Sequence, residues 1–264
     1  MTIVEAILLG LIQGLTEFLP VSSSGHLVLF QNIFGTPGDM LFFDTMLHVG
    51  TLVAVFIVLW RDIWEILKHL FARFTWVLVV ATLPAVAAGL FLGDFFEGAF
   101  QGQYLAVGFL LTSVLLVLSE QIAAKRQPRY FEKDQIRFST AFGVGCMQAV
   151  AILPGVSRSG STLAGSLMAG LDRSLAATFS FLMSIPVILG SAVMQGYDIL
   201  KNGAGEIYWG PTLLGMVAAA ISSFFAAKFM LKLVRNKKLY GFAIYTAVLG
   251  VLVLLDQLVF HIVF

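Results

Sequence analysis

Residues 138–171 read FSTAFGVGCMQAVAILPGVSRSGSTLAGSLMAGL, and this stretch decides how the chain is folded. It is apolar enough to enter a membrane, but Pro154 interrupts it near its middle and small polar residues follow the proline. Proline stops a helix, whereas serine and glycine favour the start of the next one. The stretch is therefore expected to form two short helical arms joined at a tip.

The composition of the whole chain excludes a soluble protein. Of 264 residues, 59% are hydrophobic and 12% are charged, with mean hydropathy +0.93, whereas soluble domains have about 45–50% apolar and about 25% charged residues. The net charge of +1 provides no field that would attract nucleic acid, so no nucleic-acid partner is expected. A single cysteine, Cys146, is expected to be a small core residue.

Six further stretches are long and apolar enough to cross a bilayer, which takes about 20 residues in a helix. They are residues 41–60, 74–93, 98–119, 174–197, 207–227 and 239–255. Lys and Arg accumulate on the cytoplasmic side of membrane proteins. They are concentrated here in three loops, residues 61–73, 125–137 and 232–238, which are therefore expected in the cytoplasm.

This orientation restricts the two remaining apolar segments. Residues 138–171 must leave the cytoplasmic side and return to it, and residues 2–39 must begin and end outside. Neither can cross, so both are expected to be re-entrant, and non-helical backbone at that depth must be buried in protein or line a wet cavity. The predicted fold is an all-α polytopic membrane protein with six transmembrane helices, two re-entrant helical hairpins and both termini outside.

The two hairpins resemble each other in sequence. Residues 13–25, QGLTEFLPVSSSG, and residues 148–160, QAVAILPGVSRSG, share a glutamine, a Leu-Pro pair and a Val-Ser-x-Ser-Gly run. Together with the opposite orientations, this similarity predicts an inverted repeat, about 1–120 and 138–264, joined by the cytoplasmic loop 121–137 in one membrane domain, 1–264. Inverted repeats of this kind bring interrupted helices together at a functional site.

Each tip ends where a helix begins, and the free amides of a helix N-terminus bind anions. Two such ends meeting from opposite leaflets suit a phosphate or a pyrophosphate. Arg158 lies at the second tip, where a guanidinium costs at least about 2.5–3.5 kcal/mol and so needs a partner or a task. The guanidinium can donate two parallel hydrogen bonds to phosphate oxygens. The alternative is that it forms an ion pair with Glu17.

The first tip carries further reactive groups. Glu17 lies one helical turn after Gln13, so the two side chains share a face, and the carboxylate is able to hold a divalent cation. His26 follows Ser23 by three residues and is expected to reach its hydroxyl as an acid or a base. A hydroxyl nucleophile, a base, a carboxylate and an anion site together indicate phosphoryl transfer.

Asp44 and His48 share one face of the stretch 41–60 and are expected mainly to serve in packing or at the helix start, with a role in lining the site as the less favoured alternative. The sequence contains no Walker loop and no His-Glu-x-x-His motif, so nucleotide-driven transport and zinc chemistry have no support.

Residues 13–26, QGLTEFLPVSSSGH, and 153–162, LPGVSRSGST, resemble the two signature motifs of the bacterial undecaprenyl-diphosphatase family, the bacitracin-resistance proteins. The resemblance runs nearly end to end, including residues 42–51 and 180–186. It implies a multi-pass enzyme of the bacterial inner membrane, active on the periplasmic side with a divalent cation such as Mg²⁺ or Ca²⁺. Its substrate would be undecaprenyl diphosphate, hydrolysed to undecaprenyl phosphate and inorganic phosphate for reuse in peptidoglycan synthesis.

The resemblance also implies roles for individual residues. Ser23 would be the nucleophile, with His26 a contender for that role or the group that activates Ser23 or a water. Glu17 would be an acid/base group or a metal ligand together with Gln13, which stands where the family has Glu or Gln. The diphosphate would be held by Ser24, Ser157, Arg158, Ser159 and Thr162.

A second interpretation stays open at this point, since inverted repeats with broken helices are also typical of secondary transporters. A polyprenyl-phosphate flippase or an anion transporter would use the same anion site. It would have no use for the nucleophile and base expected at Ser23 and His26. The sequence leaves open a homodimer as well.

Overall fold

The computed structural model describes residues 1–36, 40–99, 102–202 and 208–264. These residues form helices and no β-strand. The α-helices are α1 (Ile3–Glu17), α2 (Ser23–Phe34), α3 (Leu41–Val58), α4 (Trp60–Lys68), α5 (Arg73–Phe91), α6 (Gly93–Ala99), α7 (Leu105–Ala124), α8 (Phe138–Val150), α9 (Arg158–Ala169), α10 (Arg173–Asn202), α11 (Trp209–Asn236) and α12 (Tyr240–Leu255). A 3-10 turn, η1 (Lys133–Gln135), precedes α8, and a π-helical turn, η2 (Asp256–Phe260), follows α12.

Six of these helices, α3, α5, α7, α10, α11 and α12, are long and apolar enough to span a membrane. Each coincides with one of the six predicted stretches, so the prediction of six spans is confirmed. Two boundaries were wrong. Residues 98–119 contain a break before α7, and the span expected at 207–227 continues in α11 to Asn236, so most of the loop expected at 232–238 is helical. Gly102, in the turn that precedes α7, has φ +98, a backbone conformation outside the helical region.

Two local predictions were also wrong. The cation-rich segment 61–73, expected as a loop, contains the amphipathic helix α4, which buries Ile63 and exposes Arg61, Glu65 and Lys68. The loop was inferred from its Lys and Arg residues alone, which do not distinguish a loop from an amphipathic helix. Only one residue, Leu59, separates α3 from α4. Cys146 is exposed on α8 instead of lying in the core, because the outer face of a membrane helix is as apolar as its inner face.

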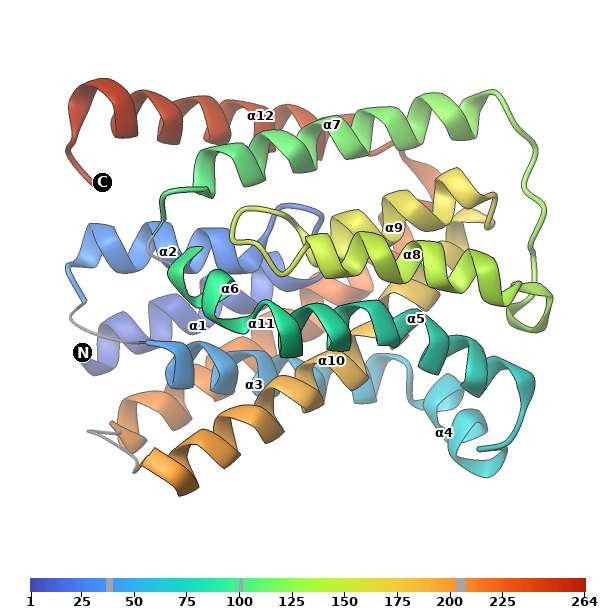
Figure 1. Ribbon diagram of the computed structural model, residues 1–264, viewed down its shortest axis with the longest axis horizontal. Coiled ribbons are helices and arrows are strands. Elements are labelled where there is room, and N and C mark those ends of the chain that lie inside the picture. Colours follow the sequence, from blue (N-terminus) through green and yellow to red (C-terminus); the bar gives the residue numbers. More distant parts are fainter. Residues whose placement is uncertain (37–39, 100–101, 203–207) are drawn as a thin grey trace.

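Two helical hairpins, α1–α2 and α8–α9, lie among the six long helices. They extend from opposite ends of the molecule, and their tips lie near its middle (Figure 1). Both chain termini lie at one end, whereas α4 and the segment joining α7 to α8 lie at the other. The cation-rich loops are thus gathered at the end opposite the termini, as the charge pattern predicts.

Small residues allow the arms of each hairpin to approach a long helix of the other half of the chain. Helix α1 packs on α11 and α8 packs on α5. A Cβ added to Gly10 would lie 2.3 Å from the carbonyl oxygen of Gly215, and one added to Gly145 would lie 2.3 Å from that of Ala81. In lipid, helices associate through such close backbone packing because the hydrophobic effect provides no driving force between them.

The tips meet each other through glycines. A Cβ on Gly25 in the first tip would lie 2.9 Å from Cα of Gly155 in the second tip. Gly155 has φ +86, and its own Cβ would lie 2.5 Å from the carbonyl oxygen of Leu105. The hydroxyl of Thr112 on α7 holds this tip by donating to the carbonyl of Gly155 and accepting from the backbone amide of Ser157.

The substitution Gly155→Ala is therefore expected to destabilise the protein by at least about 2 kcal/mol, because a side chain is both strained at this φ and in contact with backbone. Gly89→Ala is the control, since a Cβ there meets nothing within 4 Å and alanine favours a helix. Thermal unfolding in detergent measures both. Equal stability of the two variants would show that the tips do not depend on this close contact.

Candidate active site

Both tips are built in the same way, and in each a serine caps the second arm. The hydroxyl of Ser22 accepts from the backbone amide of Gly25 at 3.2 Å, and that of Ser157 accepts from Gly160 at 3.0 Å. The predicted serine caps are confirmed. Because the caps are equivalent, Ser23 and Arg158 occupy the same position in their two tips, the first residue of α2 and of α9.

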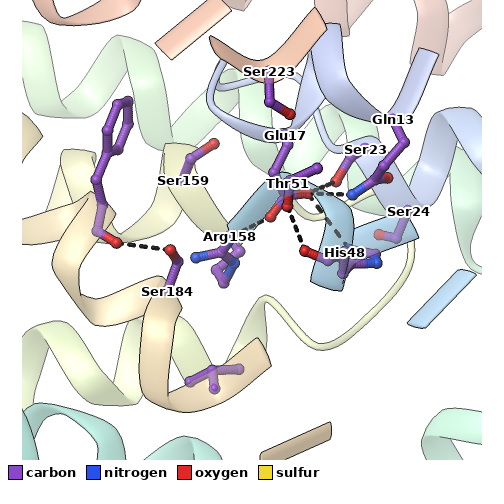
Figure 2. A network of polar contacts seen from close by, with 12 residues as sticks. Gln13, Glu17, Ser23, Ser24, His48, Thr51, Arg158, Ser159, Ser184 and Ser223 are labelled. Carbon is purple, nitrogen blue, oxygen red and sulfur yellow. Dashed lines mark hydrogen bonds and ion pairs between the residues drawn. The ribbon is translucent and has the colours of Figure 1, made fainter. Parts of the chain in front are cut away.

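Glu17, the last residue of α1, lies between these two positions (Figure 2). Its Oε2 accepts a hydrogen bond from Ser23 Oγ at 2.6 Å and another from Gln13 Nε2 at 2.7 Å. Its Oε1 forms an ion pair with the guanidinium of Arg158. Glu17 is only 3% exposed, so its charge is satisfied by these partners and not by water.

Arg158 thus forms the ion pair with Glu17 that the sequence interpretation gave as the alternative to phosphate binding. It engages only the NH2 nitrogen of the guanidinium. Within the described part of the chain, the Nε and NH1 groups donate no hydrogen bond. The side chain is 16% exposed. The guanidinium therefore keeps donors with which an anion could bind while the ion pair persists.

His26 has different partners from those expected. Its Nδ1 lies 2.7 Å from the carbonyl oxygen of Ser22, and its Nε2 lies 2.7 Å from the hydroxyl of Tyr245 on α12. A carbonyl only accepts, so Nδ1 carries the proton and, in the neutral ring, Nε2 accepts from Tyr245. The predicted contact with Ser23 is not formed, because both ring nitrogens are engaged elsewhere. His26 instead ties the backbone of Ser22, which has φ +68, to α12.

His48, which the sequence interpretation assigned mainly to packing, is a member of the site. Its Nε2 lies 3.4 Å from Glu17 Oε2, and its Nδ1 donates to the carbonyl of Asp44 at 2.8 Å. In the neutral ring, Nε2 is therefore an unprotonated acceptor that faces the Glu17 cluster. The signal for this role was the ionisable side chain within a membrane span, which marks a functional residue by default.

The remaining predicted site residues build the second tip. Ser159 Oγ donates to the carbonyl of Leu19 at 2.9 Å and so bridges the two tips. Thr162 is fully buried, with its hydroxyl 2.9 Å from the carbonyl of Arg158 and 2.5 Å from the hydroxyl of Ser180. Ser24 is half-buried beside the first cap. The structure thus joins Gln13, Glu17, Ser23, His48 and Arg158 directly, while Ser157, Ser159 and Thr162 support them.

A divalent cation can be tested against the donors present. Gln13 donates through Nε2 to Glu17, so its Oε1 is left as a buried acceptor, and this oxygen has no partner among the described residues. The described residues contain no cluster of three or more His, Cys, Asp or Glu. Mg²⁺ is commonly held by one or two carboxylates together with substrate phosphates. One carboxylate, one amide oxygen and a bound diphosphate therefore fit this ion.

Comparison with the sequences of known proteins assigns the chain to a family. The sequence model described as "Bacitracin resistance protein BacA" matches residues 6–252. The chain belongs to the BacA family. A relative named "Undecaprenyl-diphosphatase" from Carboxydothermus hydrogenoformans is 43% identical over 256 residues, covering 96% of this chain and 97% of the relative. One of the same name from Halothermothrix orenii is 40% identical over 259 residues, covering 97% and 98%. The two motif segments of this BacA-family chain, residues 13–26 and 153–162, meet at Glu17, which contacts Ser23 of the first segment and Arg158 of the second.

The role of Tyr245 can be tested by removing its hydroxyl alone. Tyr245→Phe leaves the buried Nε2 of His26 without its hydrogen bond and is expected to cost about 1–2 kcal/mol in the free energy of unfolding. Tyr197→Phe on the exposed face of α10 is the matched control. Thermal unfolding in detergent compares the two. A loss as small as that of the control would mean that the bond to His26 does not hold the tip.

Proposed function

We propose that this BacA-family protein is an undecaprenyl-diphosphatase that hydrolyses undecaprenyl diphosphate to undecaprenyl phosphate and inorganic phosphate. The observation that carries the proposal is the 2.6 Å hydrogen bond from Ser23 Oγ to Glu17 Oε2, next to the guanidinium of Arg158. A hydroxyl on a carboxylate beside a cation is a nucleophile, a base and an anion site in contact. The names of the relatives support the same reaction.

The diphosphate is expected to bind with its terminal phosphate on Arg158 and on the free amides at the start of α2 and α9. Its negative charge competes with Glu17 for the guanidinium. The carboxylate then loses part of the attraction that stabilises its charge and is better able to accept a proton. Substrate binding therefore prepares Glu17 to act as the base.

In the first step, Ser23 Oγ attacks the terminal phosphorus while Glu17 takes the hydroxyl proton. The bond from that phosphorus to the bridging oxygen breaks, and undecaprenyl phosphate leaves with the bond's electron pair. The phosphoryl group is now on Ser23. Arg158 stabilises the charge that spreads over the phosphoryl oxygens during the transfer.

In the second step, a water attacks the same phosphorus and the bond to Ser23 Oγ breaks. Glu17 returns its first proton to Ser23 Oγ and takes one from the water. It passes this second proton to the phosphate, which becomes H2PO4⁻, so Glu17 ends the cycle as a carboxylate. Inorganic phosphate leaves. His48 Nε2, at 3.4 Å from Glu17 Oε2, is the second group placed to hold or move a proton at this atom.

A divalent cation held by Glu17 and Gln13 would add positive charge for the phosphate oxygens. The buried Oε1 of Gln13, which lacks a partner among the described residues, supports this proposal. The groups that accept and return protons, Glu17 and His48, are side chains of the protein itself.

We place the enzyme in the bacterial inner membrane, with the site reached from the periplasmic side. The first hairpin starts at the end of the molecule that carries both termini, opposite the cation-rich loops. In this proposal α1–α2 and α8–α9 are re-entrant hairpins of an inverted repeat, which is supported by the exchanged packing of α1 on α11 and of α8 on α5. A carrier of anions would need Arg158 but not the bond between Ser23 and Glu17.

Removing the Ser23 hydroxyl tests the nucleophile. Ser23→Ala is expected to lower phosphate release from a polyprenyl diphosphate at least about 100-fold, since both the nucleophile and the proton that Glu17 accepts are lost. Ser191→Ala on the exposed part of α10 is the matched control. Normal turnover by Ser23→Ala would show that the nucleophile is a water and not Ser23. Phosphate release that is unaffected in Glu17→Ala, His26→Ala and Arg158→Ala would contradict the proposal that the protein is an enzyme.

Removing metal ions tests the cation. Phosphate release is expected to stop in excess EDTA and to return on titration with Mg²⁺. Gln13→Glu supplies a second carboxylate and is expected to lower the Mg²⁺ concentration for half-maximal activity by about 10-fold, because carboxylates bind this ion more tightly than amides. Full activity in EDTA would remove the cation from the account and leave Arg158 as the main cationic group.

A further inference from the structure

A cavity of about 180 Å³ lies at the end of the molecule that carries the cation-rich loops, apart from the site at the tips. It is lined by the last turns of α7 and α9, the segment after α7, the start of α10 and Lys238, which precedes α12. Arg158 begins α9 and Ala169 ends it. At a rise of 1.5 Å per residue, the cavity is about 18 Å from the catalytic tip.

The wall of the cavity contains one ion pair that is already complete. The guanidinium of Arg173 binds both oxygens of Glu120, at 2.8 and 3.0 Å, and also donates to the carbonyls of Val234 and Lys237. The backbone amide of Leu239 donates to the same carboxylate at 2.9 Å. The charge of Glu120 is therefore neutralised and is not available to other cations.

Three more cations, Arg126, Arg129 and Lys238, line the same cavity. All three are exposed, and their side chains form no hydrogen bond or ion pair with another described residue. The positive-inside rule explains why cations lie at this end. It does not explain why three of them surround one cavity with no acidic residue left to balance them.

The rest of the lining is apolar, from Ala123 and Ala124 on α7 to Leu167 and Met168 on α9. At the end of α9 the carbonyls of Leu167 and Ser166 accept from the amides of Gly170 and Leu171, so these two acceptors are already engaged. The cavity thus combines unbalanced positive charge with an apolar wall. A phospholipid with a negatively charged headgroup combines the complementary features, and basic pockets between membrane helices bind such headgroups.

We infer that this cavity binds the phosphate headgroup of an anionic phospholipid in the leaflet facing the cation-rich loops. The phosphate lies among Arg126, Arg129 and Lys238, and the acyl chains follow the apolar wall toward the bilayer. The bound lipid holds together the ends of α7, α9 and α12. It contacts the helix that carries Arg158, but at the opposite end from the catalytic tip.

The test uses the full chain in detergent, stripped of lipid, and measures lipid binding by native mass spectrometry. Phosphatidylglycerol is expected to bind more tightly than phosphatidylcholine. Replacing two of the unpaired cations, in Arg126→Gln/Lys238→Gln, is expected to weaken phosphatidylglycerol binding by about 30-fold, since each basic residue near a headgroup contributes about 1 kcal/mol. Lys68→Gln/Lys232→Gln removes equal charge at the same end outside the cavity and is expected to leave binding unchanged.

Equal binding of the two lipids, or undiminished phosphatidylglycerol binding by the cavity variant, would overturn the inference. Inorganic phosphate is added in a separate arm, where it is expected not to displace the lipid. Displacement by phosphate alone would assign the cavity to a free anion and overturn the lipid site. Because the readout is binding, its outcome does not depend on phosphate release at Ser23.

Discussion

A buried carboxylate and a partly buried guanidinium near the centre of the molecule hold the rest of the structure in place. Neither Glu17 nor Arg158 could carry its charge alone at this depth, and each is supplied by a different hairpin. Their pairing requires the two tips to meet, and the tips meet only because Gly25 and Gly155 carry no side chain at the contact. The same pairing places Ser23 on the carboxylate, so one interaction supports both the fold and the proposed chemistry.

The catalytic proposal depends on how fully the neighbours of this pair are engaged. Ser23 and Gln13 share one oxygen of Glu17, and His48 approaches the same oxygen from α3. His26 is held away from it by Ser22 and Tyr245. The geometry therefore favours Glu17 over His26 as the base for Ser23. It gives His26 the task of fixing the strained backbone from which Ser23 extends.

Local patterns in the sequence were sufficient to predict the spans, the two tips and the shared face of Gln13 and Glu17. Each follows from a short-range rule: apolar length, a proline break followed by a serine cap, or a spacing of four residues. Contacts between helices were not predictable in this way. The spacing from Ser23 to His26 suggested a contact, but a tertiary partner, Tyr245 on α12, took the ring nitrogen. His48 was assigned mainly to packing because its partner, Glu17, belongs to another helix.

The central claim is that Glu17 and Arg158 form one coupled unit across the two hairpins. A double-mutant cycle in the free energy of unfolding tests it most directly, using Glu17→Gln, Arg158→Gln and both together. Each single substitution leaves one charge of the pair without its partner, so each is expected to lower the free energy of unfolding. The double variant removes both charges and is expected to be at least as stable as the less stable of the two single variants. Additivity of the two single effects to within about 0.5 kcal/mol would contradict the account.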